Sequence, residues 1–122
     1  MKLPLFLLTV AMLNVSALAA DGPVRHVVHF KFKTGADQKQ VQNVVEAFAA
    51  LKTKIPVIDA LEWGTNVSPE GLSKGFTHCW IISFKNEKDR DAYLVHRDHK
   101  AFVDVLKPVL EEALVVDFIP QK

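Results

Sequence analysis

Two histidines, His26 and His78, lie where the local sequence pattern favours an apolar side chain. Residues 24–33 and 76–85 each alternate between two kinds of side chain, as the two faces of a β-strand do. The apolar faces consist of Val24, His26, Val28, Phe30 and Phe32 in the first segment and of Phe76, His78, Trp80, Ile82 and Phe84 in the second. A neutral imidazole takes up or releases a proton near pH 7. The pair therefore indicates either acid–base groups in an apolar binding cavity or two core histidines hydrogen-bonded to the backbone.

Several other chemistries lack their residue patterns in this sequence. There is no HExxH, CxxC or two-histidine–one-carboxylate motif, no glycine-rich phosphate loop and no serine nucleophile elbow. His96 and His99 are three residues apart, but zinc sites usually gather three or four ligands. We therefore predict neither a metal site nor a cofactor. The single Cys79 excludes an internal disulfide, and we expect it to be half-buried on the strand face opposite His78. We expect His29 and His96 to be exposed and to have no role.

The first 19 residues have the features of a secretory signal peptide. Lys2 precedes an apolar run over residues 3–15, and Ala17 and Ala19 occupy the small-residue positions of an A-x-A cleavage site. The run is shorter than the ~20 apolar residues of a membrane-spanning helix. We therefore expect cleavage after Ala19 and no stable membrane insertion afterwards; the alternative is an uncleaved anchor. The sequence thus predicts a secreted or periplasmic protein.

The charges are balanced. The 122-residue chain has 15 Lys and Arg residues against 14 Asp and Glu residues, and Lys2 belongs to the segment predicted to be removed. This balance argues against nucleic acid or an anionic membrane surface as a partner.

The histidine-bearing strands belong to a longer alternation of strands and helices. After a lead-in over 20–23, we predict four strands, over 24–33, 57–67, 76–85 and 114–119. We also predict a helix over 38–54 and a short helix over 87–95. A further helix begins with Asp98 as its cap and is kinked or broken at Pro108. The order is β-α-β-β-α-β, which predicts an α+β, ferredoxin-like fold with a four-stranded antiparallel sheet and the helices on one face. The other face is rich in apolar side chains and needs cover. A homodimer with the sheets packed face to face would provide it.

The sequence resembles a known family at several separate places. The matching segments are residues 24–33, Trp63-Gly64, Gly75–Cys79, Asp91–Phe102 with its Tyr-x-x-His-x-x-His pattern, and Asp117-Phe118. Together they resemble the stress-responsive A/B barrel domain, or Dabb, family over residues 24–120. The resemblance implies a dimeric α+β barrel.

The resemblance also implies a set of working residues. Polyketide cyclases of this family close a poly-β-keto thioester by an intramolecular aldol condensation without a cofactor. Their two strand histidines match His26 and His78, their tyrosine matches Tyr93, and their base matches His99. The aldol reaction needs a base and a donor to the enolate oxygen. Tyr93 and His99 are therefore the candidate catalytic residues, with substrate contacts from His26, His78, Val28, Phe30 and Trp80, and Phe48 and Phe102 either in the lining or in the core.

Three functions agree with these observations. The first is an exported homodimer that binds a small apolar or aromatic carbonyl compound in a pocket lined by histidine and tyrosine. The second is a cofactor-independent cyclase, isomerase or monooxygenase with His99 as general base. The third is a dimeric interaction module without a ligand. Export argues against a polyketide thioester, because such thioesters are cytosolic.

Overall fold

The computed structural model describes Lys2 and residues 22–122. The predicted signal peptide, apart from Lys2, lies outside the described residues. The elements are β1 (Val24–Phe32), α2 (Gln38–Lys54), β2 (Ala60–Thr65), β3 (His78–Phe84), α3 (Glu87–Val95), α4 (Arg97–Leu106) and β4 (Leu110–Phe118). Among the residues described, no helix is long and apolar enough to cross a membrane.

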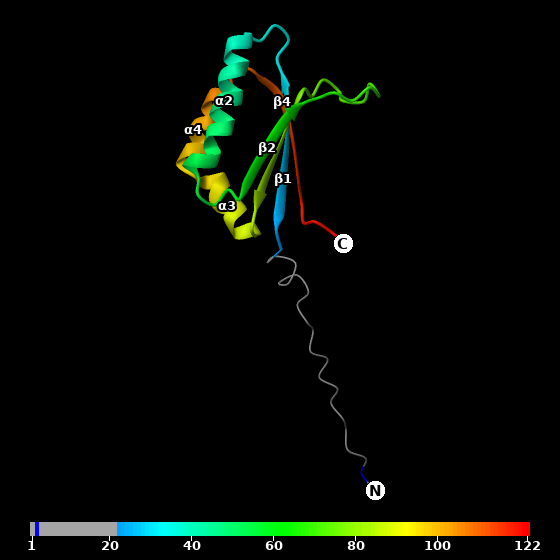
Figure 1. The fold of residues 1–122 in the computed structure, drawn as a ribbon, viewed down its shortest axis with the longest axis vertical. Helices are drawn as coiled ribbons and strands as arrows, with labels where there is room; N and C mark the ends of the chain where they lie inside the picture. Colours follow the sequence, from blue (N-terminus) through cyan, green and yellow to red (C-terminus); the bar gives the residue numbers. More distant parts are fainter. Residues whose placement is uncertain (1, 3–21) are drawn as a thin grey trace.

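The four strands form one antiparallel sheet in the order β2-β3-β1-β4. The helices lie on one face of this sheet, with α2 and α4 side by side (Figure 1). This arrangement confirms the predicted ferredoxin-like α+β fold. The register places His26 of β1 opposite Ile82 of β3 on one side and opposite Asp117 of β4 on the other.

Local chemistry explains where the helices begin and end. The side chain of Asp37 accepts a hydrogen bond from the backbone N–H of Lys39 at 2.8 Å and caps the start of α2. Helix α2 ends at Lys54, two residues before Pro56, which cannot continue a helix. Between α3 and α4, His96 accepts a hydrogen bond from the N–H of Asp98 at 3.0 Å and is the N-cap of α4.

Some predicted boundaries were wrong. The N-cap of α4 is His96 rather than Asp98, and His96 is half-buried rather than exposed. Helix α4 ends at Leu106, and Pro108 lies in the turn that leads to β4, which begins at 110 rather than 114. β2 covers only 60–65, because the chain turns after α2 and the N–H of Ile58 bonds the carbonyl of Ile55 at 3.1 Å.

The face of the sheet away from the helices carries apolar side chains without cover. On β4, Leu114, Val116 and Phe118 have exposed fractions of 47%, 52% and 48%. The register places Val27 of β1 next to Val116 on the same face. Cys79 also lies on this face and is half-buried, as predicted.

Candidate functional site

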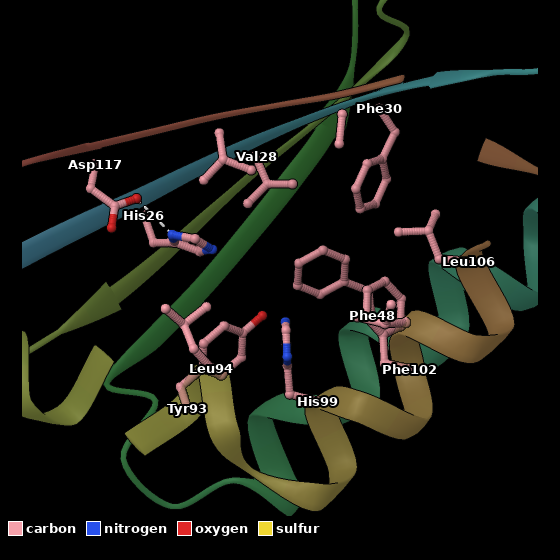
Figure 2. A pocket seen from close by; sticks show the side chains of 13 residues that line it. His26, Val28, Phe30, Phe48, Tyr93, Leu94, His99, Phe102, Leu106 and Asp117 are labelled. Atoms are coloured by element: carbon pink, nitrogen blue, oxygen red, sulfur yellow. Dashed lines mark hydrogen bonds and ion pairs between the residues drawn. The ribbon is translucent and has the colours of Figure 1, made fainter. Parts of the chain in front are cut away.

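A cavity of about 460 Å³ lies between the sheet and the helices. Figure 2 shows side chains from β1, β4, α2, α3 and α4 around it. Its wall consists of His26, Val28, Phe30, Phe48, Tyr93, Leu94, His99, Phe102, Val103, Leu106, Ala113, Val115 and Asp117. The polar side chains gather at one end, and the aromatic and aliphatic ones form the rest.

His26 is held at the polar end by a carboxylate. The two residues are direct cross-strand neighbours on β1 and β4, a position in which side chains contact each other. His26 Nδ1 lies 2.6 Å from Asp117 Oδ1, and His26 is only 5% exposed. The other carboxylate oxygen accepts a hydrogen bond from Arg90 Nη1 at 3.0 Å. The buried imidazole is therefore bonded to a side chain and not to the backbone.

Tyr93 and His99 form the second polar group of the wall. Tyr93 lies near the end of α3 and His99 in the first turn of α4, so the break between these helices brings their rings to a centroid distance of 4.5 Å. Figure 2 shows the Tyr93 hydroxyl pointing toward the His99 ring. The rings of His26 and Tyr93 are 5.7 Å apart. Three predicted site residues thus meet in one cavity.

Burial determines the protonation of this pair. Desolvation raises the pKa of Tyr93 well above its ordinary value of 10.0, so the phenol keeps its proton and is a donor. Desolvation lowers the pKa of His99 below 6.5; a hydrogen bond with the backbone of Leu94 opposes this shift, and charge on His26 adds to it. His99 is therefore a neutral imidazole near pH 7.

The structure separates His78 and Trp80 from this cavity. Trp80 is fully buried and stacks on Phe48 and Trp63 at centroid distances of 4.1 and 4.9 Å. His78 stacks on Trp63 at 6.1 Å, and its Nδ1 lies 2.8 Å from the hydroxyl of Thr77. His78 lines a different cavity, of about 560 Å³, together with residues of the segment between β2 and β3. Val28, Phe30, Phe48 and Phe102 line the first cavity.

His29 does not line this cavity, and the described residues contain no cluster of side chains that could hold a metal ion. His29 is half-buried rather than exposed, and its Nδ1 has no hydrogen-bond partner within the described part of the chain. Among Lys2 and residues 22–122, no three His, Cys, Asp or Glu side chains gather closely enough to hold a metal ion.

Asp117 is the site residue that the sequence reasoning missed. Alternation along residues 113–117 would have placed it on the same strand face as Ala113 and Val115, with a carboxylate on an otherwise apolar face. Its position opposite His26 depends on the pairing of β1 with β4, which the sequence does not state.

The fold and the cavity define a ferredoxin-like α+β domain with a pocket lined by histidine and tyrosine. The chain belongs to the family described as Stress responsive A/B Barrel Domain, whose model matches residues 24–120. It is 32% identical over 101 residues to the stress-response A/B barrel domain-containing protein HS1 of Arabidopsis thaliana, covering 83% of this chain and 93% of that protein. It is 27% identical to olivetolic acid cyclase of Cannabis sativa, covering 81% and 98%.

Solved structures show the same relationship. The hydroxynitrile lyase from Passiflora edulis superposes with a TM-score of 0.77 at 25% identity, over 84% of this chain and 96% of that one. A dimeric protein of unknown function with a ferredoxin-like fold from Bacteroides fragilis superposes with a TM-score of 0.67 at 28% identity, over 81% and 97%. The solved structures similar to this chain thus include a protein named as an enzyme and a dimeric protein.

Proposed function

We propose that this protein is a cofactor-independent enzyme that acts on a small, uncharged carbonyl compound or its adduct, with His99 as general base. The observation that carries the proposal is the convergence of His99, Tyr93 and His26 in one apolar cavity. An open cavity whose buried histidine is bonded to a side chain favours a ligand over the interaction-module alternative.

The protonation states fit proton transfer at carbon or oxygen. A neutral His99 takes a proton from a carbon flanked by carbonyls, or from a hydroxyl group. The protonated Tyr93 donates a hydrogen bond to the oxygen on which negative charge develops. Both groups act from positions fixed by the ends of two helices.

The wall of the cavity defines the class of substrate. No lysine or arginine lines it, and its carboxylate, Asp117, is already paired. An anionic ligand would therefore find no cation there. Phe30, Phe48 and Phe102 offer an aromatic surface at the other end. The preferred ligand has one carbonyl or hydroxyl head and an apolar or aromatic tail.

The relatives support this class of chemistry. One is named as a hydroxynitrile lyase and another as a cyclase. In a hydroxynitrile, removal of the hydroxyl proton with loss of cyanide leaves a carbonyl compound. Base-driven aldol closure likewise changes a bond at a carbonyl carbon. Our proposal for this chain is that shared step, not either named substrate.

The test combines binding and turnover on residues 20–122. Aromatic hydroxynitriles and neutral β-keto compounds are screened by thermal shift, and hits are assayed for product. A ligand at a hundredfold its Kd should stabilise the fold by ~2.7 kcal/mol. His99→Ala should lower turnover by ~10²–10⁴-fold and Tyr93→Phe should lower it too, while His78→Ala, outside the cavity, should leave it unchanged. Binding without turnover would leave a ligand-binding protein, and no shift with any compound would reject the proposal.

The assembly we propose is a homodimer built on the uncovered sheet face. Its support is the row of exposed apolar side chains on β4 and the dimeric relative from Bacteroides fragilis. Light scattering should give twice the chain mass. Val116→Glu should shift it toward the monomer, while Val105→Glu, equally apolar and exposed on α4, should not. A parent chain of single mass would contradict this assembly.

We also propose export, on the basis of the sequence of residues 1–19 alone. The full chain expressed with its own leader should be recovered outside the cytoplasm. Its intact mass should then correspond to residues 20–122. Recovery of the uncut chain in the cytoplasm would contradict the proposed export.

A further inference from the structure

Arg90 lies outside the cavity wall but contacts the residue that holds His26. It belongs to α3, three residues before Tyr93, and its side chain is 19% exposed. Its Nη1 donates to Asp117 Oδ2 at 3.0 Å, while the opposite oxygen, Oδ1, faces His26 Nδ1 at 2.6 Å. One carboxylate thus links a permanent cation on a helix to a buried imidazole on a strand.

The geometry of this linkage restricts the imidazole. An ionised carboxylate only accepts hydrogen bonds, so His26 donates from Nδ1. The ring then presents Nε2 as an acceptor, and Figure 2 shows this second nitrogen directed away from Asp117. The guanidinium holds the carboxylate from a second direction, which fixes its rotation.

From this geometry we infer that Arg90 is a positioning residue of the proposed active site, which acts through Asp117 to hold the His26 ring in place, with its proton on Nδ1 and Nε2 free to contact the substrate. The importance of Arg90 for catalysis rests on the proposed function. Its effect on the position and tautomer of His26 can be tested without turnover.

The groups around His26 support this role. Arg90 and His26 contact opposite oxygens of the Asp117 carboxylate, so the guanidinium holds the carboxylate without competing for Oδ1. The other polar groups near the ring are Tyr93, which stays protonated, and His99, whose pKa is lowered by burial. From β3 the ring meets only apolar side chains, including Phe84 at a centroid distance of 6.4 Å.

Arg90 has further contacts that hold it in place. Its Nε lies 3.0 Å from Asp91 Oδ1, and its Nη2 lies 4.0 Å from Glu87. These acids stand on the solvent side of the same helix, so they orient the guanidinium without reaching His26. A neutral replacement at position 90 therefore removes the only cation on Asp117 among the contacts of the described residues.

The test is histidine side-chain NMR of residues 20–122 at pH 7, which reports the nitrogen that carries the proton. The parent should show His26 with the proton on Nδ1; a proton on Nε2 would overturn the inference directly. Arg90→Gln, or Arg90→Met should the first variant not fold, should lower the share of His26 that carries its proton on Nδ1. Arg90→Lys should restore most of the parent behaviour. Lys88→Gln removes an equal charge from an exposed position of the same helix and should change nothing.

Kinetics then separate this inference from the proposed function. With a substrate in hand, Arg90→Gln should lower kcat near pH 7, with KM nearly unchanged, because His26 Nε2 is then less often free as an acceptor. An unchanged His26 tautomer in a folded Arg90→Gln variant would reject the role of Arg90 even if the enzyme is active. Absence of turnover in every variant, with the tautomer change present, would reject the proposed function instead.

Discussion

The layer between the sheet and the helices has two ends that differ in packing. At one end Trp80 is fully buried between Phe48 and Trp63 and fills the layer between the sheet and α2. At the other end, near β1 and β4, the layer holds a cavity of about 460 Å³. A histidine lies on the apolar strand face at each end, but only the one beside the cavity is paired with a carboxylate.

The difference shows how one fold separates stability from chemistry. Aromatic stacking at the filled end gives contact area and fixes the sheet against α2. At the hollow end the helical layer breaks between α3 and α4, and this break places Tyr93 and His99 over the cavity. The tightly packed end can thus stabilise the fold. The end with the cavity can then keep polar groups that are bonded to one another rather than closely packed.

The largest expected effect comes from removing the centre of the filled end. Trp80→Ala should lower the free energy of unfolding by about 3–5 kcal/mol, because the cavity it leaves is enclosed by Phe48 and the sheet. Urea unfolding measures it. Trp63→Ala is the control, since Trp63 is 42% exposed and loses fewer contacts. Equal costs for the two variants would contradict the view of a filled, tightly packed end.

Replacing each of the two strand histidines should have a smaller effect on the free energy of unfolding, and the two effects should differ. His26→Ala removes the buried partner of Asp117 and should lower the free energy of unfolding by about 1–3 kcal/mol. His78→Ala removes a half-exposed ring bonded to Thr77 and should cost within about 0.5 kcal/mol. Urea unfolding of both variants at pH 7 gives the comparison. A larger cost at His78 would reverse our assignment of the two ends.

Sequence periodicity was sufficient for the fold and for the faces of the strands that contain His26 and His78. It placed His26, Trp80 and the helix over 38–54 correctly because side-chain alternation and helical stripes are local properties. It grouped His78 with His26 because alternation gives the face of a strand but not the position along the sheet. That position depends on register, which puts Phe30 opposite His78 and Ile82 opposite His26.

The partners Asp117 and Arg90 escaped prediction for a related reason. Arg90 lies in a segment where charges are common. Asp117 stands out on an otherwise apolar strand face, but that pattern does not say which side chain it pairs with. They become meaningful only when β4 lies beside β1 and α3 lies across the end of the sheet. His96 was missed because its ring replaces the usual Ser, Asp or Asn of a helix N-cap.

The smallest expected effect is on the pH dependence of stability, and it draws on both ends. Burial lowers the pKa of His99 and of His78 below 6.5, so the unfolded chain binds protons more readily than the folded one. The contribution of these two neutral histidines to the free energy of unfolding should be fully present above pH 6.5. It should be lost as the pH falls through the lowered pKa values. Urea unfolding from pH 8 to 5 measures it. His99→Gln and His78→Gln should each flatten the acid limb, because each removes a buried imidazole whose pKa is lowered. An acid limb equally steep in both variants would assign the effect to other groups.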